Sequence, residues 1–144
     1  MPDRHLVDAH IALLRGSRVL LSRRRGDAFD GCWHLPSGKV DAGEHVVSAA
    51  VREADEEVGV RIDPADLVHV HSVHITGPGQ EPRFGFFFRT SRWSGEPVNR
   101  EPAKCHELGW FELDALPEPM IGYAAVGLRA LRGGGPAFSV HGWE

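Results

Sequence analysis

The hydrophobic and polar positions of this chain predict strands, a helix, further strands and a second helix, in that order. Residues 5–14 and 19–25 predict two strands joined by an Arg-Gly-Ser turn, which makes a β-hairpin. A polar loop is expected at residues 26–31, and residues 33–36 predict a short strand that enters a Ser-Gly turn. The chain is therefore expected to begin with sheet.

The second half of the chain also predicts strands followed by a helix, without an internal sequence repeat. Residues 68–75 and 84–89 predict two strands, joined by a loop that a Gly-Pro-Gly motif and the next proline mark. Residues 110–113 predict a last strand, and residues 120–131 predict a helix ended by the Gly-rich segment 133–136. This order indicates an α/β fold with a mixed β-sheet covered by helices.

The segment between these halves, GKVDAGEHVVSAAVREADEEVGV at residues 38–60, is the most informative one. A helix is predicted at residues 44–58, because apolar residues recur there at helical spacing: Val47, Ala50, Val51, Ala54 and Val58. Glu53, Glu56 and Glu57 stand at i, i+3 and i+4, within an arc of roughly 100°. The three carboxylates therefore share one face, beside the apolar face that can pack on the sheet.

Three carboxylates this close together repel one another and raise each other's proton affinity unless a cation lies among them. Hard divalent ions, Mg²⁺ above all, prefer such oxygen ligands. Arg52 lies one helical turn before Glu56 and can hold that carboxylate, although an ordinary surface ion pair explains the spacing equally well. The spacing E-x-x-E-E on a helix more often marks a solvent-exposed face than a metal site. The rest of the segment therefore decides between these two interpretations.

The rest of the segment is a specific pattern: glycine, five residues, glutamate, seven residues, then R-E-A-x-E-E-x-G-V. Its specified positions are Gly38, Glu44, Arg52, Glu53, Glu56, Glu57 and Gly59. This pattern resembles the Nudix box of the Nudix hydrolase superfamily. Ala54 departs from it, since the family usually has a larger aliphatic residue there, and this concerns helix packing. The resemblance implies a single Nudix domain over residues 1–144, folded as an α/β/α sandwich with a loop-helix-loop catalytic motif.

The resemblance also implies a chemistry, the hydrolysis of a diphosphate linkage with Mg²⁺, for which Mn²⁺ can substitute. The metal-binding positions carried over from the family are Gly38, Glu53, Glu56 and Glu57, with Arg52 orienting the acids. Bound metal neutralises phosphate oxygens and lowers the pKa of water, while a carboxylate removes the proton.

The resemblance leaves two kinds of candidate for the general base. Some family members use the first box glutamate, here Glu53, and others use an acid from a loop beyond the box. Glu107 is the candidate of that second kind, with Glu101 behind it. For either loop acid alone, a solubilising surface charge is the plainer interpretation.

Phosphate binding needs cations, and Arg23 and Lys39 stand where similar proteins contact phosphates. Arg24 and Arg25 continue the run, but adjacent strand residues face opposite ways, so the three arginines are not expected to enter one cleft together.

Aromatic side chains could stack a nucleobase, and Phe29 is the candidate for this role. Trp33, Phe86 and Trp93 are further possibilities, although aromatic residues on strands are usually core. The histidines include no H-x-x-x-H pair, which argues against a zinc site.

Small size and the Trp-His-Leu-Pro-Ser-Gly-Lys sequence that leads into the box favour the family branch that releases pyrophosphate from nucleoside triphosphates. Family members more often have Gly-Gly before that lysine, so Ser37 argues against the specialists for oxidised guanine. One alternative is a hydrolase of a nucleotide sugar, ADP-ribose or another linked diphosphate. Another is a non-catalytic, nucleotide-sensing Nudix domain, and a third is an isopentenyl diphosphate isomerase, whose members are longer and depart from the box.

Composition limits the partners and the location. Net charge is −4 with acids and bases interspersed, so a small-molecule nucleotide is expected rather than bulk nucleic acid or a membrane surface. Cys32 and Cys105 show no metal-ligand or redox spacing, and no signal peptide or membrane-length apolar run is visible. A cytoplasmic protein, monomeric or homodimeric, is expected.

Overall fold

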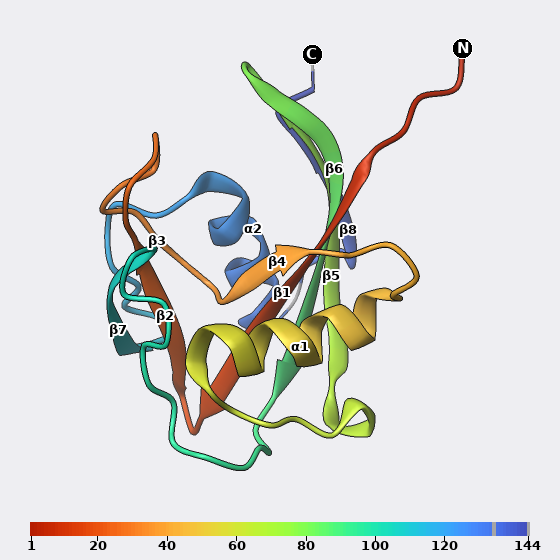
Figure 1. Ribbon diagram of the computed structural model, residues 1–144. Coiled ribbons are helices and arrows are strands. Elements are labelled where there is room, and N and C mark those ends of the chain that lie inside the picture. Colours follow the sequence, from red (N-terminus) through yellow and green to blue (C-terminus); the bar gives the residue numbers. More distant parts are fainter. Residues whose placement is uncertain (134, 144) are drawn as a thin grey trace.

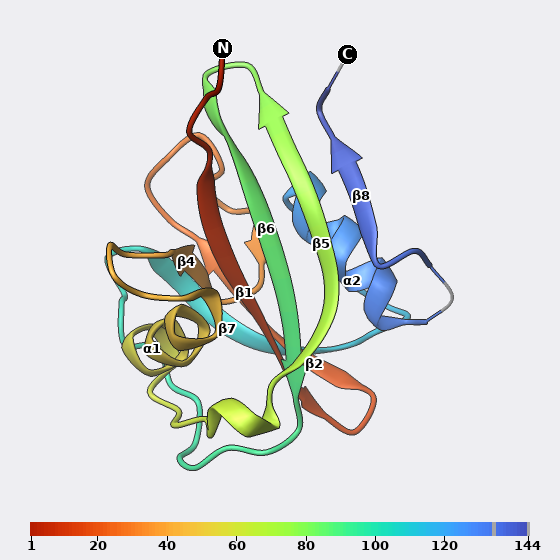
Figure 2. The same ribbon diagram turned by 90° about the vertical axis from the view of Figure 1, so that its right-hand side faces the viewer.

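The computed structural model describes residues 1–133 and 135–143 and has a mixed sheet with a helix on each face (Figures 1 and 2). Its elements are β1 (Leu6–Arg15), β2 (Arg18–Arg24), β3 (Trp33–His34), β4 (Ser37–Lys39), α1 (Val46–Val58), a 3₁₀ turn (Pro64–Asp66), β5 (Val68–Gly77), β6 (Gln80–Thr90), β7 (Cys105–Glu112), α2 (Gly122–Leu131) and β8 (Phe138–His141). The strand order is β3-β2-β1-β6-β5-β8, with β4 paired to β1 and β7 to β2. The pairs β1–β6 and β5–β8 are parallel and the others antiparallel, which confirms the mixed sheet of a Nudix-type α/β/α sandwich.

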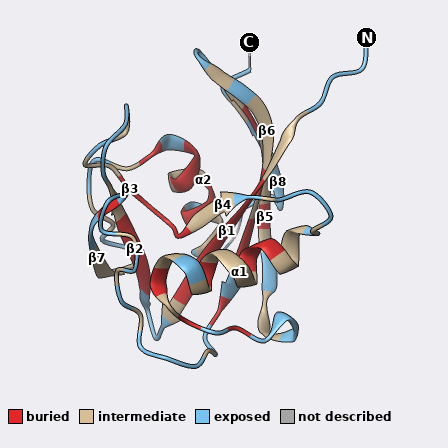
Figure 3. Cartoon of the chain, viewed as in Figure 1, coloured by how far each residue is buried: buried red, intermediate tan, exposed pale blue. Residues whose placement is uncertain are grey.

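Strand β1 lies in the middle of the sheet, and residues 8–13 are all buried (Figure 3). Its side chains alternate between the two faces, as strand geometry requires. Ala9, Ile11 and Leu13 belong to the core under α1, whereas Ala12 belongs to the core under α2. Both faces of β1 are therefore covered, which explains its nearly continuous apolar sequence.

Helix α1 buries the apolar face that the sequence predicts, with Ala49, Ala50, Ala54 and Val58 against the sheet. It begins at Val46, two residues later than predicted, because Glu44 is used instead to accept hydrogen bonds from Arg52 and from the backbone of Asp41. His45 caps the first turn, its ring accepting from the Ser48 N–H at 3.2 Å. Gly59 ends the helix at φ 73°, a left-handed conformation that favours glycine.

Several predicted elements are confirmed, and others need correction. The hairpin of β1 and β2 and the hairpin of β5 and β6 are present. Residues 37–39 form strand β4 rather than a turn, and Pro82 lies within β6 rather than in the loop. Strand β7 begins at Cys105, well before the predicted residue 110.

Strand β8 was not predicted at all, because only four residues pair with β5 after the Gly-rich segment. Helix α2 ends at Leu131 as predicted, although it begins at Gly122 rather than at residue 120. Gly134 of the predicted terminating segment lies outside the described residues. Within the described ranges, the helices are all too short or too polar to cross a membrane.

Candidate active site

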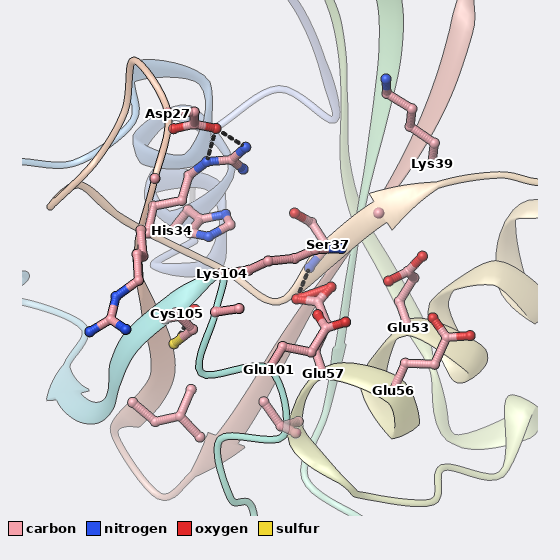
Figure 4. Close-up of a pocket in the computed structure, with 18 residues that line it drawn as sticks. Asp27, His34, Ser37, Lys39, Glu53, Glu56, Glu57, Glu101, Lys104 and Cys105 are labelled. Atoms are coloured by element: carbon pink, nitrogen blue, oxygen red, sulfur yellow. Dashed lines mark hydrogen bonds and ion pairs between the residues drawn. The ribbon is translucent and has the colours of Figure 1, made fainter.

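A cavity of about 590 Å³ opens where the carboxylate face of α1 meets the ends of β2, β4 and β7 (Figure 4). Its lining residues are Ser22, Arg24, Arg25, Gly26, Asp27, His34, Ser37, Gly38, Lys39, Glu53, Glu56, Glu57, Val58, Glu101, Ala103, Lys104, Cys105 and Leu108. Acidic residues from α1 and basic residues from β2, β4 and the segment before β7 thus face one space. A cavity of this size is typical of small-molecule sites.

Glu53, Glu56 and Glu57 rise from α1 into this cavity, so the structure brings the three predicted acids together (Figure 4). The Glu53 carboxyl group lies against the backbone of Gly38. A Cβ atom added to Gly38 would lie 2.1 Å from Glu53 Oε1, so only glycine admits this approach. The box glycine is therefore required by a contact inside the site as well as by its position in the loop.

The Glu57 carboxyl group is the most perturbed acid of the cavity. It accepts a hydrogen bond from the Ser37 N–H at 3.3 Å. Burial raises its pKa well above the usual range, and the neighbouring Glu53 carboxylate raises it further. Glu57 is partly buried and lines the cavity. Without a cation among them, the two acids therefore disfavour being ionised together.

This arrangement fits a hard divalent cation. A positive charge among Glu53, Glu56 and Glu57 would remove the repulsion that raises the pKa of Glu57. Carboxylate oxygens suit Mg²⁺ better than softer ions. In residues 1–133 and 135–143, no group of three His, Cys, Asp or Glu side chains is arranged to hold a metal ion by itself. Water or substrate oxygens would therefore complete the coordination.

Arg52 is not a lining residue of the cavity, but its guanidinium forms hydrogen bonds with the acids. Its Nη1 donates to Glu53 Oε1 at 2.8 Å and to Glu56 Oε2 at 3.1 Å. Its Nε and Nη2 donate to Glu44 at 2.8 and 2.9 Å, and Nη2 also donates to the Lys39 carbonyl at 3.1 Å. These bonds lower the pKa of Glu44 to about 2 and raise the pKa of Arg52. One guanidinium thus ties the box loop to two acids of the helix.

The cations of the cavity are Arg24, Arg25, Lys39 and Lys104. Arg23, the predicted phosphate contact, is not among the lining residues. Its Nε donates to the Gly31 carbonyl at 3.2 Å, and its Nη1 lies 3.6 Å from Glu107 Oε2. Ser22 and Arg24, two residues apart on β2, both line the cavity, so the alternation of side chains along the strand turns Arg23 away from it.

The two acids beyond the box are separated by the structure. Glu101 lines the cavity, and Lys104 enters it close by (Figure 4). Glu107 is not in the lining and lies on β7 beside Arg23, because β7 starts earlier than predicted and leaves no loop at that residue.

The predicted stacking residue Phe29 lies elsewhere. It lines a second hollow of about 250 Å³, together with Ile121 and Tyr123 of the α2 region. Trp33 is buried and packs edge to face on Phe111, with 4.8 Å between ring centroids. Phe86 and Trp93 pack against the core under α1.

His34 is a cavity residue that the sequence did not single out. It is 6% exposed, its Nδ1 has no hydrogen-bond partner in the described structure, and burial lowers its pKa to about 4. Cys105 also reaches the cavity, where Ser22 Oγ donates to its Sγ at 3.1 Å. Nothing in the spacing of His34 or Cys105 distinguishes them from core residues before the fold is known.

Comparison with known proteins agrees with this geometry. Residues 4–130 match the family model of the NUDIX domain. The chain belongs to the Nudix hydrolase superfamily. The Nudix fold is shared with the crystal structure of a MutT NUDIX hydrolase from Burkholderia pseudomallei, with a TM-score of 0.83 and 32% identity over 90% of this chain and 99% of that one.

Two curated relatives of this Nudix chain have named activities. An ADP-ribose pyrophosphatase of Methanocaldococcus jannaschii is 34% identical over 107 residues, which are 72% of this chain but only 60% of that protein. An 8-oxo-dGTP diphosphatase of Haemophilus influenzae is 32% identical over 117 residues, or 79% of this chain and 82% of that protein. The relatives thus act on different nucleotide compounds.

Proposed function

We propose that this chain is a Mg²⁺-dependent hydrolase of a nucleoside diphosphate compound, and that its substrate is a (d)NTP cleaved to nucleoside monophosphate and pyrophosphate. The composition of the cavity supports this proposal. Acids from α1 line one wall, and the other lining residues include four cations, Arg24, Arg25, Lys39 and Lys104. Such a site can bind a metal and the phosphates that the metal bridges in the same space.

The metal would be held by the Gly38 carbonyl and by Glu53, Glu56 and Glu57. When bound, the metal would neutralise phosphate charge and lower the pKa of a coordinated water. Arg52 keeps two of these acids oriented through its bonds to Glu53 and Glu56.

Hydrolysis needs a base for the attacking water, whose oxygen forms a bond to phosphorus while the bridging P–O bond breaks. We assign Glu101 to accept the proton, because it lines the cavity from outside α1 and lies close enough to Glu57 to raise the pKa of that carboxyl group, and Glu53 is the alternative. Glu107 is displaced from this role by its position beside Arg23.

Phosphate binding falls to the four cavity cations. Lys39 keeps the role that the sequence predicted, whereas Arg24 and Arg25 replace Arg23. Arg24 is held by Asp27, to which its Nε donates at 2.9 Å, so its guanidinium is positioned before substrate binds.

The main alternative is a linked diphosphate such as ADP-ribose, which the M. jannaschii relative supports. A nucleotide sensor is disfavoured because every specified polar position of the box is intact. We also propose a cytoplasmic location, which the free state of Cys32 and Cys105 supports.

The test incubates the protein with Mg²⁺ and a panel of nucleoside triphosphates, oxidised nucleotides, nucleotide sugars and ADP-ribose, with products separated by chromatography. Monophosphate plus pyrophosphate from a triphosphate supports the proposal, and cleavage of only linked diphosphates favours the alternative. A variant with Glu56→Gln and Glu57→Gln, checked for folding by circular dichroism, should be inactive. Full activity in that variant or in excess EDTA would refute the metal assignment.

A further inference from the structure

A chain of hydrogen bonds runs along the rim of the cavity, from the loop after β2 to the start of β7. The Gly26 N–H donates to Asp30 Oδ1 at 2.9 Å, and His106 Nε2 lies 2.9 Å from the same oxygen. On the other side of the imidazole, Arg25 Nε donates to His106 Nδ1 at 3.1 Å. His106 thus joins an acid of one segment to a cavity arginine.

The direction of each bond is fixed by chemistry. A guanidinium only donates hydrogen bonds, so His106 Nδ1 must accept and carries no proton. The ring proton then lies on Nε2 and is donated to Asp30, whose carboxylate only accepts. These bonds to Gly26 and His106 lower the pKa of Asp30, which keeps it ionised in this role.

Arg25 is held at two nitrogens. Besides the bond to His106, its Nη1 donates to the Pro102 carbonyl at 3.0 Å, and its backbone N–H donates to the Lys104 carbonyl at 2.9 Å. Two bonds from different nitrogens fix the guanidinium plane. Among the residues that the structure describes, Nη2 has no protein acceptor and stays available to an anion in the cavity that Arg25 lines.

We infer that His106 is a positioning residue, which orients Arg25 for the phosphates of the substrate through its unprotonated Nδ1. The inference rests on the proposed function, since it takes the anion to be a nucleoside diphosphate compound. A pre-oriented arginine binds an anion with less loss of side-chain freedom than a mobile one. His106 therefore acts on substrate binding and leaves the bond-breaking step to the acids of α1 and to Glu101.

Two conservative variants separate the two halves of the imidazole. Asparagine places a carbonyl oxygen near the position of Nδ1 and can accept from Arg25, but it is too short to reach Asp30. Glutamine places its amide nitrogen near Nε2 and can donate to Asp30, but it offers Arg25 no acceptor at the Nδ1 position. His106→Leu removes both bonds.

The expected result is a rise in KM of about three- to tenfold for His106→Gln and His106→Leu, with kcat within about twofold of the wild type. His106→Asn should keep KM near the wild-type value. Adding Arg25→Ala to His106→Gln should raise KM no more than Arg25→Ala alone. His69→Gln is the matched control, since His69 lies on β5 and its side chain forms a hydrogen bond only with Ser72 among the described residues.

The opposite pattern, with His106→Gln normal and His106→Asn impaired, would overturn the inference, because the bond to Asp30 would then matter instead. A fall in kcat at unchanged KM would also overturn it.

A second readout does not depend on turnover. The Arg25 Nε–H signal in a ¹H–¹⁵N spectrum, assigned by its loss in Arg25→Lys, should be protected from solvent exchange in the wild type and in His106→Asn, and unprotected in His106→Gln. Equal protection in all three would refute the positioning role. If the wild type cleaves nothing in the substrate panel, the proposed function fails while this spectrum still tests whether His106 holds Arg25.

Discussion

The carboxyl group of Glu53 lies so close to the α-carbon of Gly38 that residue 38 has no room for a side chain. An alanine Cβ at residue 38 would lie 2.1 Å from both Cδ and Oε1 of Glu53. Gly38→Ala must therefore move Glu53 or the β4 backbone. We expect kcat/KM to fall more than about hundredfold, because small displacements of positioned groups have effects of this size.

Gly135→Ala is the control for this substitution, since a Cβ there meets nothing within 4 Å and its φ is not in the left-handed region. It should leave kcat/KM and Tm unchanged. A fully active Gly38→Ala protein would show that Glu53 does not need its observed position.

Glu57→Gln is expected to stabilise the metal-free protein while abolishing activity. Burial and Glu53 raise the pKa of Glu57, so its ionised form destabilises the fold, and a neutral amide avoids that repulsion. We expect Tm in EDTA at pH 8 to rise by roughly 3 °C or more. Thermal unfolding followed by circular dichroism measures this, and a lower Tm would contradict it. Mg²⁺ should stabilise the wild type more than the variant.

The same carboxyl group predicts how stability depends on pH. Its folded-state pKa is raised, so the folded protein binds the proton more tightly than the unfolded chain does. The stabilisation is complete below the usual glutamate pKa and is lost as pH rises through the raised one. In EDTA, wild-type stability should fall over that range relative to Glu57→Gln, and saturating Mg²⁺ should reduce the difference. Parallel urea titrations across pH would disprove this if the two proteins kept a constant gap.

Arg52→Lys tests whether the fork of the guanidinium is needed. A lysine ammonium cannot reach Glu44, Glu53 and Glu56 together as the observed bonds require. We expect kcat/KM to fall about ten- to hundredfold and Tm to drop. Arg100→Lys is the matched exposed control, because the ion pair of Arg100 with Asp55 is long, with 3.5 Å between Nη1 and Oδ1. Equal effects of the two substitutions would argue against a special role for Arg52.

Glu101→Gln and Glu107→Gln separate the two acids beyond the box. Glu101 lines the cavity and Glu107 does not, so kcat should fall about 10²- to 10⁴-fold for Glu101→Gln and less than about threefold for Glu107→Gln. Steady-state kinetics at saturating Mg²⁺ measures both. If both variants stay active, Glu53 becomes the base, and if only Glu107→Gln is impaired, the assignment from the structure is reversed.

The helix α1 could be predicted well because its signals are local. Spacing along one helix decides that Glu53, Glu56 and Glu57 share a face, and Gly59 ends the helix by its own backbone preference. No distant part of the chain can alter these relationships without unfolding the helix.

The remainder depended on contacts between distant segments. Strand β4 exists because residues 37–39 pair with β1, although Ser and Gly are poor strand formers. Alternation along β2 indicates that Arg23 and Arg24 face opposite ways, but only the packing of distant segments shows that the cavity lies on the side of Arg24. The bond from Arg25 to His106 spans 81 positions, so sequence spacing carries no sign of it.

All the lining residues of the cavity lie between Ser22 and Leu108. In the part of the chain that the structure describes, α2 and β8 contribute none of them and instead cover or extend the other side of the sheet. The cavity residues and the carboxy-terminal elements thus occupy separate stretches of the sequence. A substitution in α2 or β8 can therefore act on the cavity only indirectly, through the sheet between them.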